Sequence, residues 1–434
     1  MSAAGDPAAA AAAAAAGEDQ PRAGVLAQQL LNIVLFVTIL TSAIAFIEPS
    51  PHDVMMFVLL VACVTARVPF DRRLTPLLVL TIVWLVGGAM SVIQVVDDEK
   101  AVQYLGTSVY LGCAAILFAC LFSEGDAIRL NILRRAYLLA AMLATVAGYI
   151  GFFHLLPGAD IFLDGVRVSA TFKDPNVYGP FLIFPLLMLM IGLMTRGIRL
   201  FDLTVMVALL GGLLLSFSRG AWVHFVVSAS VCFMILLVVT PEPRMRSRMV
   251  LLGIVAMVVM AALVVAFLSL DSIHDLFVER AKVIQPYDVG PGGRFTEQKL
   301  ALSVILDHPN GMGPFAFANT YGLQQHNVYM QGFLVYGWLG GATYLTLVAA
   351  TLMIGLRAVL VRSPWQHYLI AAYAVFVGEL VEGMIVDTDH WRHFFLMIGL
   401  IWGLMVANQK AAWRAGAGFA GSEQSINGRM QASP

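Results

Sequence analysis

The stretch DSIHDLFVERAKVIQPYDVGPGGRFTEQKLALSVILDHPNGMGPFAFANTYGLQQHNVY, residues 271–329, is the only long polar segment between hydrophobic runs of the sequence. Its glycines and prolines predict turns at 290–293 and 311–314, with a helix from Arg294 to His308 between them. Connections within compact proteins are normally short, so an ordered loop of this length indicates a functional segment. Arg294 and His326 flank the predicted helix, and both could contact a charged substrate.

The overall composition is that of a membrane protein. Of the 434 residues, 59% are hydrophobic and only 12% are charged, which excludes an ordinary soluble domain. The net charge of −1 gives no sign of nucleic-acid binding, and no nucleic-acid partner is expected. The four cysteines fall within apolar runs and are interpreted as buried hydrophobic residues, not as a disulfide framework or a metal site. They are Cys63, Cys113, Cys120 and Cys232.

Apolar runs long enough to cross a bilayer recur along the chain and predict about twelve transmembrane helices. They lie at 28–48, 53–69, 74–96, 103–122, 135–156, 177–194, 200–217, 220–240, 249–270, 328–355, 367–386 and 391–408. We therefore expect an all-α polytopic membrane protein with one large loop, 271–327, between the ninth and tenth spans. Residues 28–408 form the predicted transmembrane domain, and 1–27 and 409–434 are expected to be disordered cytoplasmic tails. The alanine-rich N-terminal tail has no basic region before its alanines, so a cleaved signal peptide is not predicted.

Charges in the short loops predict the orientation of these spans. If the N-terminus is cytoplasmic, the inner loops carry Arg67, Arg72, Arg73, Arg129, Arg134, Arg135, Arg196, Arg199, Arg244, Arg246, Arg248, Arg357 and Arg362. The short outer loops are acidic instead, at Glu48 and Asp53, at 97–99, and at Asp387 and Asp389. Because basic residues are enriched in cytoplasmic loops, both termini are predicted to be cytoplasmic and the 271–327 loop periplasmic.

Two predicted outer segments carry cations next to turn or small residues. Arg167 and Lys173 precede the Asp-Pro-Asn sequence that ends at Asn176, and this sequence is either a turn that starts a helix or a substrate contact. Arg219 lies where the seventh and eighth runs meet, in the sequence Ser-Phe-Ser-Arg-Gly at 216–220. An arginine at a span end can extend to lipid headgroups. At the outer end, however, basic residues are disfavoured, and the planar guanidinium suits phosphate oxygens.

Acidic residues near the C-terminus give two further candidates. Glu379 and Glu382 lie three positions apart in the eleventh run and therefore on one helix face. Ionisable groups inside a span indicate function, and a salt bridge to an arginine of another span is the structural alternative. The turn DTDHWRH at 387–393 could bind a divalent cation through Asp387 and Asp389, or it is an acidic turn at a span end.

Four sequence blocks, taken in order, resemble a known family. They are TFKDPN at 171–176, SRG at 218–220, Arg294 through LDHPNGMG at 306–313, and HNVY at 326–329 running into GWLG at 337–340. With the many spans and one large late loop, they resemble the O-antigen ligase and O-antigen or exopolysaccharide polymerase superfamily of bacterial inner membranes. The resemblance covers roughly residues 167–345, and the His-Asn block after the helix ending in His-Pro-Asn-Gly-Met-Gly is its most specific feature.

The resemblance implies a GT-C-like glycosyltransferase that needs no cofactor or metal. Its donor would be an oligosaccharide on undecaprenyl pyrophosphate at the periplasmic face, and its acceptor a glycan or the lipid A-core. Membrane lipids and other polysaccharide export proteins are further expected partners. The family's essential arginines would correspond to Arg219 and Arg294 and its essential histidine to His326. Substrate-binding candidates are Arg167, Lys173, Asn176, Asn327, Glu379 and Glu382.

The chemistry of these residue types agrees with that implication. Two arginines could stabilise the charge of a pyrophosphate leaving group as a metal ion would. An imidazole, with an ordinary pKa of about 6.5, suits deprotonation of an acceptor hydroxyl near neutral pH. Direct attack by that hydroxyl would invert the anomeric centre. Ligases of the family that this sequence resembles often have a longer loop than the one from Arg294 to His326, so the resemblance favours a polysaccharide polymerase, with an O-antigen ligase as the alternative.

Two other classes of protein remain open from the residues. A transporter also has about twelve spans and acidic residues inside them, although it would more naturally show paired span breaks and an internal repeat. A metal-assisted transferase could use Asp387 and Asp389. Chelator sensitivity separates the second alternative from the metal-free scheme, and glycan transfer in vitro separates an enzyme from a transporter.

Overall fold

The computed structural model describes residues 7–47, 49–269, 293–322 and 324–431. In parts of the helices only the backbone is described, and these parts include Arg294 and residues 416–431. Except for Gly293, the turn predicted at 290–293 lies outside the described residues, as does the first part of the polar loop.

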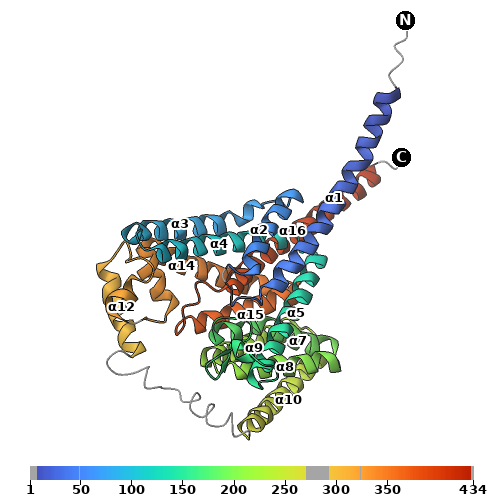
Figure 1. Ribbon diagram of the computed structural model, residues 1–434. Helices are drawn as coiled ribbons and strands as arrows, with labels where there is room; N and C mark the ends of the chain where they lie inside the picture. Colours follow the sequence, from blue (N-terminus) through green and yellow to red (C-terminus); the bar gives the residue numbers. More distant parts are fainter. Residues whose placement is uncertain (1–6, 48, 270–292, 323, 432–434) are drawn as a thin grey trace.

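The described chain is built of helices, with one short pair of strands (Figure 1). The first half contains α1 (Pro7–Thr41), α2 (Pro51–Thr65), η1 (Arg72–Leu74), α3 (Thr75–Val92), η2 (Ile93–Val95), α4 (Glu99–Phe122), α5 (Ala127–Phe152), η3 (Ala159–Phe162), β1 (Leu163–Asp164), β2 (Arg167–Val168), α6 (Pro175–Phe181), α7 (Ile183–Arg196) and α8 (Leu200–Leu215). The second half contains α9 (Arg219–Val239), α10 (Pro243–Leu268), α12 (Arg294–Asp307), α13 (Ala316–Tyr321), α14 (Val328–Val359), α15 (Gln366–Glu382) and α16 (Arg392–Gln431). The two strands are antiparallel, with Leu163 opposite Val168.

Every predicted apolar run lies on a helix, although several boundaries differ. The run at 177–194 is divided at Leu182 into α6 and α7, because Pro185 has no N–H to donate to the preceding turn. The first run ends at Thr41 instead of residue 48. Helix also extends into the segments where we expected disordered tails, since α1 starts at Pro7 and α16 ends at Gln431. Alanine has the highest helix propensity of any residue type, so the alanine run before Gly17 accounts for the early start of α1.

Eight helices among the described residues are long and apolar enough to cross a membrane. They span Gly24–Thr41, Arg72–Val95, Glu99–Phe122, Ala127–Phe152, Pro175–Arg196, Arg219–Val239, Val328–Val359 and Arg392–Ala415. Two shorter apolar helices are Pro51–Thr65 and Leu200–Leu215. The protein is therefore a multi-pass α-helical membrane protein, and the twelve-span topology stays a prediction.

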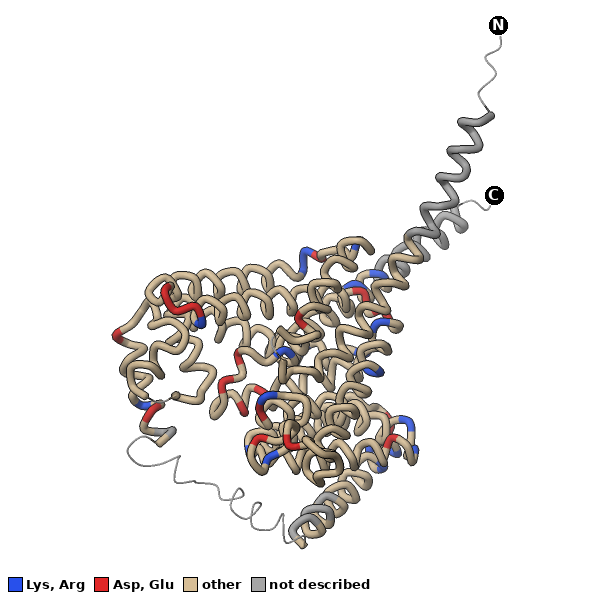
Figure 2. The backbone as a smooth tube through the Cα atoms, viewed as in Figure 1, with Lys and Arg blue, Asp and Glu red and all other residues tan. Residues whose placement is uncertain are grey.

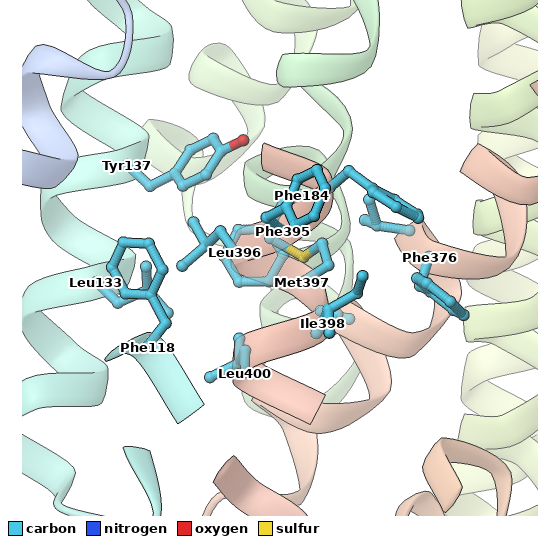
Figure 3. Packing of buried hydrophobic residues seen from close by; sticks show 14 of the residues in the cluster. Phe118, Leu133, Tyr137, Phe184, Phe376, Phe395, Leu396, Met397, Ile398 and Leu400 are labelled. Atoms are coloured by element: carbon cyan, nitrogen blue, oxygen red, sulfur yellow. The ribbon is translucent and has the colours of Figure 1, made fainter. Parts of the chain in front are cut away.

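Helices that are distant in sequence form the main packing layers. α3 packs against α14, α4 against α16, and α9 against α15, while α1 lies on α2 and α5. The first part of α16 is the most enclosed: Figure 3 shows Met397 and its neighbours meeting Phe118 of α4, Leu133 of α5, Phe184 of α7 and Phe376 of α15. Lipid tails are as apolar as these side chains, so close packing rather than escape from water stabilises such contacts.

Small residues let α3 and α14 approach closely. A Cβ at Gly87 of α3 would lie 2.5 Å from the backbone nitrogen of Gly340 in α14. α14 is also kinked at Gly337, whose φ is 66°. A Cβ there would lie 2.7 Å from the carbonyl carbon of Asn310, so the glycine leaves room for the turn that follows α12 to pack against the kink. These glycines set the position of the polar segment against the membrane helices.

The described part of the polar segment forms a small packed unit beside α14. Its core consists of Ala301, Val304, Ile305, Phe317 and Leu334. The indole of Trp338 donates to the carbonyl of Ile305 at 2.8 Å, and its backbone N–H donates to Pro309 at 2.8 Å. The helix predicted from Arg294 to His308 is thus confirmed as α12, with its last helical residue at Asp307.

Figure 2 shows where the charged residues lie along the backbone, and the orientation in the membrane stays a prediction. The basic ends of α2, α5, α7 and α10 lie toward the right of that view, whereas the acidic turn between α3 and α4 lies at its left. We use "outer side" below for the side that holds this acidic turn and the turn between α15 and α16.

A labelling experiment tests this orientation. Asp97 lies in an exposed outer turn and Ser247 is exposed near the basic start of α10. In cells with a permeabilised outer membrane, Asp97→Cys should react with an impermeant maleimide, and Ser247→Cys should react only after the inner membrane is broken. The unsubstituted protein, whose four cysteines lie in apolar helices, sets the background. Labelling of Ser247→Cys but not Asp97→Cys in intact inner membranes would reverse the topology.

Candidate functional site

The end of α15 is the point where several predicted site segments meet. We call residues 382–387 the α15 corner. The carbonyl of Gly383 accepts the N–H of Val328 at 2.8 Å, and the carbonyl of Met384 accepts the Asn327 side-chain amide at 3.0 Å. The Gln298 amide of α12 donates weakly to the same Met384 carbonyl at 3.4 Å and to Gln325 at 3.3 Å. The corner therefore connects the start of α12 to the His-Asn block.

His326 is held in an unusual backbone conformation next to this corner. Its φ is 45°, which a residue other than glycine adopts rarely and at some energetic cost. Asn327 follows as the N-cap of α14, where its Oδ1 accepts the backbone N–H groups of Tyr329 and Met330 at 3.1 Å. The His326 imidazole is 44% exposed, and its Nδ1 lies 3.8 Å from Oδ2 of Asp387. The ring is thus accessible, and a carboxylate beside it can orient it.

A second cluster surrounds the start of α9. Ser218 is the N-cap of that helix and its Oγ accepts the N–H of Ala221 at 3.2 Å, so Arg219 is the first helical residue. The Asn176 side-chain oxygen accepts from both Ser218 Oγ and the Arg167 guanidinium, each at 2.8 Å. Arg167 also donates to the Ser216 carbonyl at 3.2 Å. Two blocks that are separate in sequence, 167–176 and 218–219, are therefore one structural unit.

A buried acid–imidazole pair joins the start of α9 to the α15 corner. His224 Nδ1 and Glu382 Oε2 are 2.8 Å apart, and both side chains are fully buried. The other ring nitrogen of His224 is 3.0 Å from the Val375 carbonyl. A Cβ at Gly220 would lie 2.6 Å from Oε1 of Glu382, so α9 and the carboxylate approach closely at this glycine. The pair therefore fixes the α9 end that carries Arg219 against the end of α15.

Glu379 also faces a histidine. Its Oε1 lies 3.4 Å from Nε2 of His393 at the start of α16, and both side chains are buried. The two acids of α15 thus have histidines as the partners that the structure defines, whereas the structural alternative from the sequence was an arginine of another span. Both contacts link helices to one another, and a direct substrate contact by Glu379 or Glu382 stays a prediction.

The other predicted residues fall in different places. Lys173 is exposed and lines a separate cavity of about 150 Å³ that also includes Arg392 and His393. Arg294 begins α12, but its side chain lies outside the described residues. Asp387 contacts His326 and Asp389 accepts the Tyr104 hydroxyl at 2.5 Å, so the two acids of the outer turn have different partners. Among the described residues, no group of three or more His, Cys, Asp or Glu side chains is placed to hold a metal ion.

Sequence reasoning missed the residues that connect the clusters, mainly His224, Gln298 and Asp387 as a partner of His326. His224 lies inside an apolar run, where an ionisable residue is expensive unless it is paired. Two acids in one predicted span and a lone histidine in another were therefore a usable signal for pairing. Gln298 had no such signal, because glutamine is ordinary on an exposed helix face.

The fold and site together define a multi-pass membrane protein with arginine, histidine and amide side chains gathered at the outer helix ends. Residues 204–345 match the family model described as O-antigen ligase. This match confirms the resemblance to the O-antigen ligase and polymerase superfamily, and it includes Arg219, Arg294 and His326. A search of curated proteins finds no matching relative. The matched residues are about a third of the chain, and the match supports, at a coarse level, an enzyme related to the O-antigen ligases and polymerases.

Proposed function

We propose that the protein transfers a glycan from undecaprenyl pyrophosphate to a sugar hydroxyl at the periplasmic face, as a polymerase of exopolysaccharide or O-antigen. The observation that carries this proposal is the convergence at the α15 corner. Segments at 218–219, 294–298 and 326–327 are far apart in sequence, yet each is attached to residues 382–387 or to a helix end fixed there. Such convergence is what a catalytic site assembled from several outer loops requires.

In the proposed reaction, Arg219 and Arg294 bind the pyrophosphate, and His326 orients or deprotonates the acceptor. The acceptor oxygen forms a bond to the anomeric carbon while the bond from that carbon to the pyrophosphate oxygen breaks. The acceptor proton passes to the imidazole, and lipid pyrophosphate leaves with the bonding electrons. Asp387 supports this role because a carboxylate near Nδ1 stabilises the protonated ring. One displacement inverts the anomeric centre.

Two finer features are part of the proposal. The arginines take the charge-stabilising role of a metal ion, so transfer needs no divalent cation. Arg294 and His326 are 32 positions apart in the sequence. This loop is shorter than that of many ligases of the family, which favours polymerisation. The description of the matching family as O-antigen ligase supports the second candidate, a ligase that transfers the finished glycan to the lipid A-core.

A reconstituted assay tests the proposed function. Full-length protein in lipid nanodiscs should convert the lipid-linked repeat unit into a ladder of longer lipid-linked glycans, and excess EDTA should leave the rate unchanged. A ligase would instead extend only added lipid A-core, by one glycan per acceptor. Loss of transfer with EDTA and recovery with Mg²⁺ would contradict the metal-free scheme. No transfer to either acceptor, together with movement of lipid-linked glycan across the membrane, would indicate a transporter.

A further inference from the structure

A groove with polar walls lies between α4, the α13 segment, α14 and the turn after α15. It consists of an inner cavity of about 220 Å³ and an adjoining wider cavity of about 780 Å³. The two cavities share Tyr104, Phe315 and His390 in their walls. We call the combined space the α4 groove. Asp387 lines its inner cavity, so the groove lies next to a residue that contacts the candidate catalytic histidine, His326.

The inner cavity is lined by side chains that can form hydrogen bonds with hydroxyl groups. Three amides, Gln324, Gln325 and Gln331, face it together with the carboxylates of Asp387 and Asp389. Amides both donate and accept hydrogen bonds and carboxylates accept them, so the wall can bind groups that do both, as sugar hydroxyls do. Ordinary ligand pockets likewise combine apolar walls with a few placed polar groups.

A chain of hydrogen bonds holds these groups in position. Gln331 Nε2 donates to the Tyr104 hydroxyl at 3.1 Å, and that hydroxyl donates to Oδ2 of Asp389 at 2.5 Å. The Gln325 amide donates to the side-chain oxygen of Gln331. The orientations of the Gln325 and Gln331 amides are thereby fixed before any ligand arrives, which lowers the entropic cost of binding.

Phe315 places an aromatic ring at the junction of the two cavities. Its φ is 61°, so the backbone is strained there, and the ring remains 38% exposed. It meets the Tyr104 ring edge-on, with centroids 5.4 Å apart. An exposed ring beside fixed hydrogen-bonding groups suits a sugar, which has an apolar C–H face and a polar rim.

The charges of the inner cavity disfavour the anionic pyrophosphate group of the lipid-linked donor. Its two carboxylates would repel a pyrophosphate, and it has no lysine or arginine among its described lining residues. Burial lowers the pKa of His390, partly opposed by the adjacent Asp389, which favours the neutral imidazole. The cavity therefore differs from the arginine-containing cluster at the start of α9, where an anion would be stabilised.

We propose that the inner cavity binds an uncharged sugar residue of the acceptor glycan and that the wider cavity carries the next residues of that glycan. This inference rests on the proposed function for the role of the sugar as acceptor. The wider cavity falls within the range of about 300–1,000 Å³ that is typical of ligand pockets, and the inner one is smaller, as a subsite for one ring would be. The two carboxylates select against acidic sugars at that subsite.

A binding experiment tests the groove without requiring transfer. The probe is the repeat-unit glycan released from its lipid by mild acid and labelled with a fluorophore at its reducing end. Full-length protein should bind it, and Gln331→Ala and Gln324→Ala should each weaken binding by about tenfold, the equivalent of one hydrogen bond to the sugar. Gln324 is exposed, so its substitution leaves the packing intact even if Gln331→Ala perturbs the hydrogen-bond chain.

A matched control is another glutamine outside the groove. Gln94 donates its amide to the backbone carbonyl of Gly311, and Gln94→Ala should bind the released glycan as the unsubstituted protein does. Undecaprenyl pyrophosphate without sugar should bind all variants equally, which also verifies that they are folded. Unchanged glycan binding by both Gln324→Ala and Gln331→Ala, or no binding by the unsubstituted protein, would overturn the subsite.

The same measurements separate the groove from the proposed function. The protein could bind the glycan in a way that depends on Gln324 and Gln331 and yet transfer nothing from lipid-linked donors. That result would support the sugar site and contradict the proposed transferase function. Conversely, the protein could transfer glycan normally while neither glutamine substitution changes glycan binding. That result would support the transferase function and contradict the sugar site.

Discussion

Replacement of His326 by alanine should lower glycan transfer by about 10²–10⁴-fold, the usual effect of removing a positioned acid–base group. The imidazole is 44% exposed and lies beside a carboxylate instead of inside the packed core, so the amount of folded protein should not change. The measurement is the initial rate of purified protein with lipid-linked repeat unit, together with its affinity for that donor, which should stay close to normal.

The positive φ of His326 makes a second substitution informative. Asparagine tolerates this left-handed conformation better than alanine but cannot accept the acceptor's proton. His326→Asn should therefore be as inactive as His326→Ala. Recovery of activity in the asparagine variant would mean that the residue serves the backbone turn and not the proton transfer.

The arginines should respond differently from the histidine. Arg219→Lys and Arg294→Lys keep the positive charge but lose the two-pronged contact with phosphate oxygens. We expect both variants to bind the lipid-linked donor more weakly, whereas the histidine variant binds it normally. Normal donor affinity in both lysine variants would remove the pyrophosphate assignment.

Replacement of Glu382 by alanine should destabilise the protein by about 1–3 kcal/mol, because it leaves Nδ1 of the buried His224 ring without its partner. Transfer should fall with it, since the pair joins the α9 end that carries Arg219 to the corner that holds Asn327. The measurements are the midpoint of unfolding in detergent and the transfer rate at a temperature where the variant is folded.

Glu382→Gln is the matched control, because an amide can still hydrogen-bond the His224 ring. It should retain most of the stability that alanine loses. His224→Ala and the double variant complete a double-mutant cycle, and the double variant should lose less than the sum of the two single losses. Additive losses would show that the two side chains do not stabilise one another. Glu379→Ala should have a smaller effect, since its contact with His393 is longer, at 3.4 Å.

Particular residues show where sequence reasoning was sufficient. Lipid offers no partner for backbone polar groups, so apolar runs such as 103–122 must be helical, and α4 contains this whole run. Asn327 could be recognised as the start of α14, because its side chain accepts hydrogen bonds from the first N–H groups of the helix. Local chemistry likewise predicted α12 and the end of that helix before Pro309. These features depend on neighbours within a few residues.

The partners of the buried acids could not be predicted in the same way. Glu382 meets a histidine 158 positions away and Asp389 meets Tyr104, 285 positions away. Such pairs depend on which helices lie side by side, and that depends on close contacts such as Gly87 against Gly340. A pattern along one helix shows which face is apolar but not which helix will cover it.

The sequence by itself therefore determined the helical membrane class, the family resemblance and the outer-loop residues Arg219, Arg294 and His326 as candidates. These follow from apolar length, charge asymmetry and short motifs, all of which are local. Only the tertiary structure decided that the α15 corner connects His224 of α9, Gln298 and Asn327, and that α4 and α14 enclose a polar groove beside Asp387. The physical reason is that helices in lipid associate through shape and a few polar contacts, which no single segment contains.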